Sequence, residues 1–346
     1  DRKVAETFQR TSQRRFLTSQ TQEKRFAVLR IQSLITQPER FMYHLRYQST
    51  SWATHHVVSR CLDGFSFLIP LPQVVEICTG VLGYALEQHE GRIKLHHYAF
   101  LSNHFHLLLS SRETRDLASF MSLFKSKLTR ELNRFHRRSG TIWGSRYASE
   151  EVLDEESLID LIKYITQNCV KEGLVDHPSQ WTGLHGCHQL LERRVVRGPF
   201  VHRARLYKEP DLTEQEATTY HEVRLEPPPM WEREGLEAYY ERAAVLCEEA
   251  IIEARQLRQG KAMGMKRVLQ QRVFQARRAP QGTRPLCRTK CIELLKAFRE
   301  RYYRFKYEFQ EVSREVRRSI ELGLPLPAVC FPEGGVPLFG RYVVPS

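Results

Sequence analysis

The chain has 346 residues, of which 41% are hydrophobic and 10% aromatic, a composition typical of a globular protein rather than a disordered one. No apolar run is long enough for a membrane span. The net charge of +13 favours a polyanionic partner, although a merely basic protein has the same property. The eight cysteines are scattered without a CxxC pair, which indicates reduced thiols in a cytoplasmic protein.

The first 41 residues are polar and basic and predict a loose N-terminal arm. The strands and helices that we expect next, in chain order, are a strand at 56–61, a helix beginning at Pro72, strands at 93–101 and 104–109, a helix at 116–137, a strand within 142–153 and a helix at 155–170. Ser102 and Asn103 predict a two-residue hairpin turn. This order is that of an α+β, ferredoxin-like antiparallel sheet with helices on one face.

The pattern weakens after Trp181. Residues 187–230 mix short strand-like pieces with charge and end in three prolines, Pro227–Pro229, which predicts a connecting segment. Residues 231–346 then predict a mainly helical C-terminal extension, with helices over 236–259 and from Arg288 to about Leu322.

Two histidines stand on the strand that begins at His104. Because side chains alternate between the faces of a strand, His104 and His106 point the same way, about 7 Å apart, while Phe105 points to the opposite face. Such a pair suits two ligands of one metal ion. Two ordinary histidines, packed in the core or exposed at the surface, would give the same pattern.

Tyr164 and Asn168 lie four residues apart on the last helix of this region and therefore share one of its faces. The Asn168 carbonyl could be a third ligand beside His104 and His106, which would place Tyr164 next to the metal. Mixed nitrogen and oxygen ligands with open positions favour Mg²⁺ or Mn²⁺. A core aromatic role for Tyr164 remains the alternative. Tyr147 is a second candidate, but no ligand-type residue lies one helical turn from it.

The helix at 116–137 is rich in basic residues that recur every three or four positions. Only Glu131 interrupts them, so binding to a phosphate backbone is favoured over a solvated helix face. With two further arginines nearby, the predicted nucleic-acid contacts are Arg60, Lys125, Lys127, Arg130, Arg134, Arg137, Arg138 and Arg146.

Six motifs in a fixed order resemble those of the REP-associated tyrosine transposases, a branch of the IS200-like single-tyrosine HUH transposases. They are HVVSR (56–60), LSNHFHLL (101–108), FK (124–125), IWGSRY (142–147), DEESL (154–158) and YITQNCV (164–170). The resemblance spans about residues 54–186, and it assigns 42–186 as the catalytic domain. Cys169 replaces the proline that usually follows the asparagine, a difference that should alter the helix end more than the chemistry.

The resemblance implies that His104, His106 and Asn168 bind a divalent metal and that Tyr164 is the nucleophile. It also implies cleavage and transfer of single-stranded DNA next to hairpins through a 5′-phosphotyrosine link, in a bacterial protein that is a monomer or a homodimer. Two alternatives stay open. One is a domesticated hairpin-binding protein without transposition, and the other is a ferredoxin-like RNA-processing nuclease that uses its histidines for acid–base catalysis.

Overall fold

The computed structural model describes residues 47–257, 260–276, 285–325 and 332. The predicted N-terminal arm, residues 1–41, lies outside these ranges. Two compact units are distinguished, one spanning Gln48–Tyr302 and the other containing Tyr47 together with the residues from Tyr303 onward. Every residue predicted to take part in catalysis or in nucleic-acid binding lies in the first unit.

The first unit contains the predicted ferredoxin-like order. Its elements are β1 (Ala53–Arg60), α3 (Pro72–Glu87), β2 (Ile93–Leu101), β3 (His104–Ser111), α4 (Thr114–Phe135), β4 (Ala148–Val152) and α5 (Glu155–Lys171). The strands lie in the order β2-β3-β1-β4, and all of these neighbours are antiparallel. Leu101 pairs with His104, which confirms the two-residue turn. The predicted fold class is therefore confirmed.

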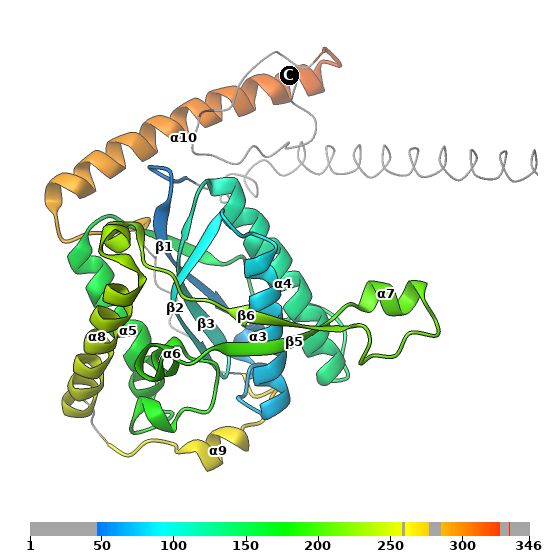
Figure 1. Cartoon of the computed structure of the whole chain (residues 1–346). Coiled ribbons are helices and arrows are strands. Elements are labelled where there is room, and N and C mark those ends of the chain that lie inside the picture. Colours follow the sequence, from blue (N-terminus) through cyan, green and yellow to red (C-terminus); the bar gives the residue numbers. More distant parts are fainter. Residues whose placement is uncertain (1–46, 258–259, 277–284, 326–331, 333–346) are drawn as a thin grey trace, which may run out of the picture. The chain divides into compact units, whose positions relative to one another are not determined.

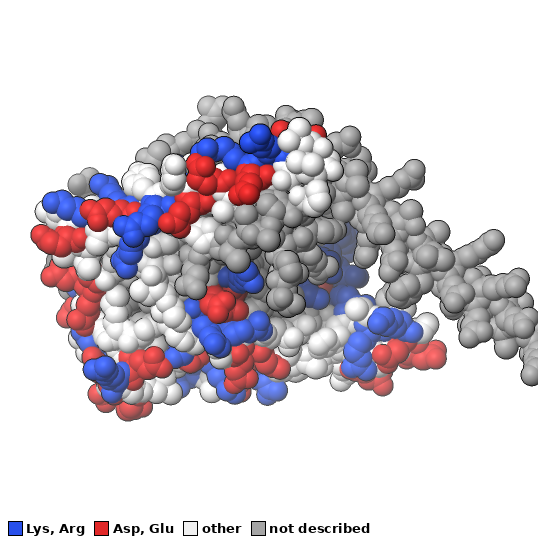
Figure 2. All heavy atoms as spheres, turned by 90° about the horizontal axis from the view of Figure 1, so that it is seen from above, with Lys and Arg blue, Asp and Glu red and all other residues white. Residues whose placement is uncertain are grey.

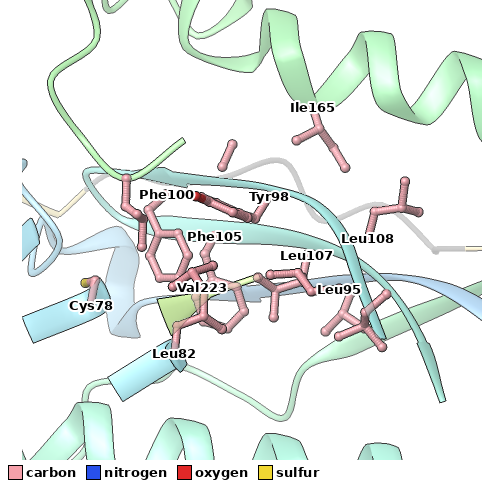
Figure 3. Close-up of a cluster of buried hydrophobic side chains, with 14 of the residues drawn as sticks. Cys78, Leu82, Leu95, Tyr98, Phe100, Phe105, Leu107, Leu108, Ile165 and Val223 are labelled. Carbon is pink, nitrogen blue, oxygen red and sulfur yellow. The ribbon is translucent and has the colours of Figure 1, made fainter. Parts of the chain in front are cut away.

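The two faces of the sheet are covered by different helices. Phe105 and Leu107 of β3 face the layer of α3 and α4, where Cys78 and Leu82 complete the core (Figure 3), and the rings of Phe105 and Phe124 are 5.4 Å apart. Figure 1 shows α3 and α4 on this side of the sheet and α5 on the other. The face opposite α3 and α4 thus carries α5, whose apolar residues, such as Ile165, are buried.

A short fifth strand, β7 (Cys287–Arg288), extends the sheet parallel to β4. The sequence predicted a helix from Arg288, but this prediction was wrong at its start, since α10 spans Ile292–Glu321. The edge of β4 provides the physical reason. The backbone amides of Glu151 and Leu153 donate to the carbonyls of Leu286 and Arg288, and satisfying these groups holds Cys287 and Arg288 in a strand.

The connecting segment folds against α3. Its elements are α6 (Gly186–Glu192), β5 (Val196–Val201), α7 (Arg203–Lys208) and β6 (Thr218–Val223). The two strands form an antiparallel ribbon, and the ring of Phe200 stacks on that of Tyr84 at 3.8 Å. The ribbon approaches α3 so closely at Gly80 that a Cβ there would lie 1.7 Å from the Pro199 carbonyl oxygen. Glycine at this position therefore permits the packing.

The C-terminal part of this unit is mainly helical, as predicted, with α8 (Gly235–Leu257) and α9 (Met265–Leu269). Helix α8 packs along α5. The Gln167 amide donates to the Ala250 carbonyl at 2.9 Å, and Lys163 pairs with Glu253 at 2.7 Å. These contacts fix the helix that carries Tyr164. Within the described ranges, none of the helices combines the length and the apolar character needed to cross a bilayer.

Candidate metal and tyrosine site

His104 and His106 project from β3 toward α5, and both are buried. Their ring centroids are 5.0 Å apart. The Nδ1 atom of His104 lies 2.7 Å from Oδ1 of Asn103, in the hairpin turn. A carboxamide oxygen only accepts a hydrogen bond, so Nδ1 of His104 carries the hydrogen in this contact. Only the Nε2 atom of His104 is then available to bind a metal. The close approach of the two rings shows that His104 and His106 lie on the same face of β3, as the alternation of side chains along a strand predicted.

Helix α5 brings Tyr164 and Asn168 against His106. The Nδ2 atom of Asn168 lies 2.9 Å from Nε2 of His106, and the half-buried ring of Tyr164 stands edge-on to His106 with centroids 5.6 Å apart. Lys171 lies above the same tyrosine ring, with its ammonium 5.2 Å from the centroid. The four residues predicted to form the site thus converge on one position between β3 and α5.

The chemistry of these donors fits a divalent cation. Oδ1 of Asn168 is buried and has no hydrogen-bond partner in the part of the chain that the structure describes. Rotation of the amide would direct this oxygen to the side on which His106 presents Nε2. Two imidazole nitrogens and one amide oxygen then leave positions open for substrate. No group of three His, Cys, Asp or Glu residues among those described could hold a metal, so the asparagine is essential to this set.

A second layer of buried polar residues lies behind His106. Its Nδ1 atom is 2.9 Å from Nε2 of His56, whose Nδ1 atom is 3.4 Å from Oε2 of Glu150. Arg288 donates to the same carboxylate oxygen. Burial alone would raise the pKa of Glu150, but hydrogen bonds from His56 and Arg288 outweigh it and hold that pKa below its usual value. Glu150 is therefore a carboxylate at neutral pH.

Sequence reasoning missed this second layer. The sequence assigns His56 only to the HVVSR motif and gives no sign that it contacts His106. To place His56 on the same face of the sheet as His104, one must know the register in which β1 pairs with β3. That register comes from the tertiary structure. Nothing in the sequence around Arg288 indicates that it lies beside Glu150, 138 residues earlier.

The basic residues of α4 divide into separate groups. Arg130, Arg134, Arg137 and Arg138 line one shallow pocket at the C-terminal end of the helix. Lys125 instead donates to the Ser145 carbonyl at 3.0 Å, and the Lys127 ammonium lies 5.6 Å from the ring centroid of Phe200. Lys125 and Lys127 diverge because residues two apart are about 200° apart around a helix.

The two remaining predicted contacts lie near Lys125. Arg60 ends β1 and is half-buried, and Arg146 is exposed in the loop before β4. The Gly144 amide donates to the Arg60 carbonyl, so this loop and the end of β1 are neighbours. Basic and acidic side chains are intermingled on the face shown in Figure 2. The positive charge is therefore not spread as one continuous patch over that face, and the pocket at the end of α4 is a local concentration of arginines.

Residues 81–168 match the family model described as "Transposase IS200 like". This segment is therefore similar to IS200-like transposases. The match begins within α3 and ends at Asn168, so it includes both histidines of β3 and Tyr164. The family resemblance that the sequence motifs predicted is therefore confirmed over these residues. This match supports a transposase.

Three solved structures resemble parts of this chain. A REP-associated tyrosine transposase bound to a REP hairpin has 18% identity and a TM-score of 0.37, covering 42% of this chain and 82% of its own. A Deinococcus radiodurans R1 protein assigned as a transposase has 14% identity and a TM-score of 0.26, covering 34% and 92%. A bacterial tRNA(His) guanylyltransferase-like protein in complex with ATP has 7% identity and a TM-score of 0.30, covering 60% and 98%. No curated protein matches the chain.

Proposed function

We propose that this IS200-like protein cuts single-stranded DNA, at hairpin or palindromic repeats, and transfers the strand through a 5′-phosphotyrosine on Tyr164. The observation that carries the proposal is the convergence of Tyr164 and Asn168 on His106, with the Asn168 contact at 2.9 Å. One face of a helix and one face of a strand meet there, inside the segment that matches the transposase family.

Each residue has a defined task in this reaction. The Tyr164 oxygen attacks the phosphorus, the bond to the 3′ oxygen breaks, and the phenol proton leaves to water while the freed 3′ oxygen takes one up. A later attack by another 3′-hydroxyl on the phosphotyrosine reverses these steps and releases the tyrosine. His104, His106 and Asn168 would hold Mg²⁺ or Mn²⁺, which supplies polarisation and positioning of the phosphate. The Lys171 ammonium above the tyrosine ring offers a positive charge to the incoming phosphate.

The arginines of the pocket at the end of α4 provide the expected contacts to the DNA backbone. They would hold the strand through charge, without reading its sequence. The contacts of α8 with α5 support attack by Tyr164 within its own chain, because moving this helix to a second copy would break them. The protein would then act as a monomer, and a homodimer would not need to exchange the tyrosine.

A covalent complex is the direct test. The full chain is incubated with a single-stranded hairpin oligonucleotide and Mn²⁺ and then run on a denaturing gel, where an adduct migrates above the free protein. We expect an adduct with the wild type and its complete loss in Tyr164→Phe, because the phenyl ring retains the packing but lacks the attacking oxygen.

Tyr147→Phe is the matched control, since Tyr147 is also partly buried in the same core and should retain the adduct. An adduct in Tyr164→Phe would assign the nucleophile elsewhere. Binding of the hairpin by the wild type without any adduct would favour a DNA-binding protein that no longer transposes. Cleavage that resists a chelator and leaves no adduct would favour a nuclease that uses histidines for acid–base catalysis.

A further inference from the structure

Behind the candidate metal ligands, a chain of buried polar groups crosses four strands of the sheet. It runs from His106 of β3 to His56 of β1, then to Glu150 of β4, and ends at Arg288 of β7. The side chains of His56 and Glu150 are only 3% and 7% exposed. Burying charge in this way costs stability unless every group is paired. Apolar residues would fill the same space at less cost, so the chain of contacts calls for a functional explanation.

The hydrogen bonds fix the protons in one direction. A carboxylate only accepts, so Nδ1 of His56 donates to Glu150, and in the neutral imidazole Nε2 of His56 is then the acceptor. Nδ1 of His106 then donates to His56, and Nε2 of His106 carries a lone pair directed at Asn168. An imidazole binds a metal in this state, and the partner of its other nitrogen determines it.

Arg288 completes the arrangement. Its guanidinium donates to the same Glu150 oxygen that accepts from His56. A cation at this place compensates the negative charge of the buried carboxylate. The residue reaches Glu150 because β7 pairs with β4 in register, with Arg288 opposite Val152. A segment far beyond the family match therefore supplies part of the surroundings of the site.

We infer that His56, Glu150 and Arg288 form a positioning relay that holds His106 as the Nδ1–H tautomer and thereby orients its Nε2 atom as a metal ligand. The part of this inference that concerns metal binding rests on the proposed function. The tautomer of His106 does not depend on the proposed function. His56 also stands edge-on to the Tyr164 ring, with centroids 6.1 Å apart, but the hydrogen bonds of the relay reach the candidate metal ligands through His106. Partners of this kind typically change metal affinity by about 10- to 100-fold when they are removed.

The test uses the full chain and two neighbouring histidines of β1. His56→Phe removes the acceptor for His106 and retains an aromatic ring, and His55→Phe is the control. His55 is equally buried but contacts Gln48 and Ser149. Binding of Mn²⁺ is followed by the loss of its free-ion electron paramagnetic resonance signal. We expect His56→Phe to weaken Mn²⁺ binding by about tenfold or more and His55→Phe to bind as the wild type does.

A second readout needs no metal. In ¹⁵N-histidine correlation spectra, with the His106 signals identified by their loss in His106→Asn, wild-type His106 should be protonated at Nδ1. In His56→Phe the proton should move, in whole or in part, to Nε2. If His56→Phe loses its circular dichroism signal, Arg288→Met takes its place. That side chain is 38% exposed, and its loss should shift affinity and tautomer in the same direction.

The outcomes separate the relay from the proposed function. Equal Mn²⁺ affinity and an unchanged His106 tautomer in His56→Phe would overturn the relay while leaving the Tyr164 adduct untouched. A wild-type protein that binds no Mn²⁺ would remove the metal from the proposed function, and the relay would then stand or fall on the tautomer alone. A wild-type His106 protonated at Nε2 would overturn the relay directly.

Discussion

At the scale of single residues, Asn168 connects the nucleophile to the candidate metal. It lies one helical turn beyond Tyr164, and its amide nitrogen is 2.9 Å from Nε2 of His106. If Oδ1 is a metal ligand, Asn168→Ala should weaken Mn²⁺ binding by more than the roughly 10- to 100-fold that follows the loss of an outer partner. Adduct formation on the hairpin oligonucleotide should then require correspondingly more Mn²⁺ in a titration.

Gln167→Ala is the matched comparison for Asn168. Gln167 precedes it on the same helix and is also buried, but it faces α8 and donates to the Ala250 carbonyl. We expect this variant to lose some stability and to keep the Mn²⁺ dependence of the wild type. If the two variants show the same Mn²⁺ dependence, Asn168 is a packing residue and the ligand set is incomplete.

At the scale of elements, the N-terminus of α5 joins the catalytic sheet to the C-terminal part of the chain. The Asp154 carboxylate accepts from the amides of Ser157 and Lys290 and from the hydroxyl of Thr289. Partial burial raises the pKa of this carboxyl, but the hydrogen bonds from Thr289 and Ser157 outweigh it and lower the pKa to about 2.

Asp154→Ala should therefore lower the free energy of unfolding by about 1 kcal/mol, as expected for the loss of a helix cap. The folded-state pKa lies below the unfolded value of about 3.9. The charge-dependent part of this stabilisation is thus fully present above that value and is lost as the pH falls toward 2. Urea denaturation at neutral pH and at about pH 3 measures both effects.

Asp154→Asn is the informative companion variant, because asparagine caps a helix almost as well as aspartate but does not titrate. It should retain most of the stability at neutral pH and flatten the decline on the acid side. An unchanged acid decline in Asp154→Asn would show that other carboxylates cause it.

The element boundaries also show what local patterns can predict. The turn at Ser102 and Asn103 and the helix that begins after Asp154 were predicted from short-range chemistry, and the structure has both. The predicted start of the last helix, at Arg288, was wrong because Arg288 pairs with the edge of β4 instead. Pairing with a distant strand overrode the local pattern there.

At the scale of the whole molecule, the effect of the net charge of +13 on DNA binding depends on where the basic residues lie. The arginines at the end of α4 line one pocket, whereas other arginines are compensated by acids. If the pocket binds phosphates, replacing both Arg130 and Arg134 with Ala should lower the salt slope of single-stranded DNA binding. The expected decrease is about 0.7 per lost contact, or about 1.4 in all. Fluorescence anisotropy across a series of salt concentrations gives the slope.

The control replaces Arg193 and Arg194 with Ala. These arginines pair with Glu237 and Glu192, so removing them should leave the slope close to that of the wild type. Equal slopes in both double variants would mean that the charge acts only as a diffuse field and that the pocket is not a phosphate site.

The sequence alone determined the strand and helix order, the shared face of His104 and His106, and the one-turn spacing of Tyr164 and Asn168. These features follow from the periods of strands and helices, which are local properties. The tertiary structure decided which residues stand behind His106, because Glu150 and Arg288 reach His56 only through the pairing of β1 with β4 and of β4 with β7. Contacts between distant strands depend on register, and register is set by the packing of the whole sheet.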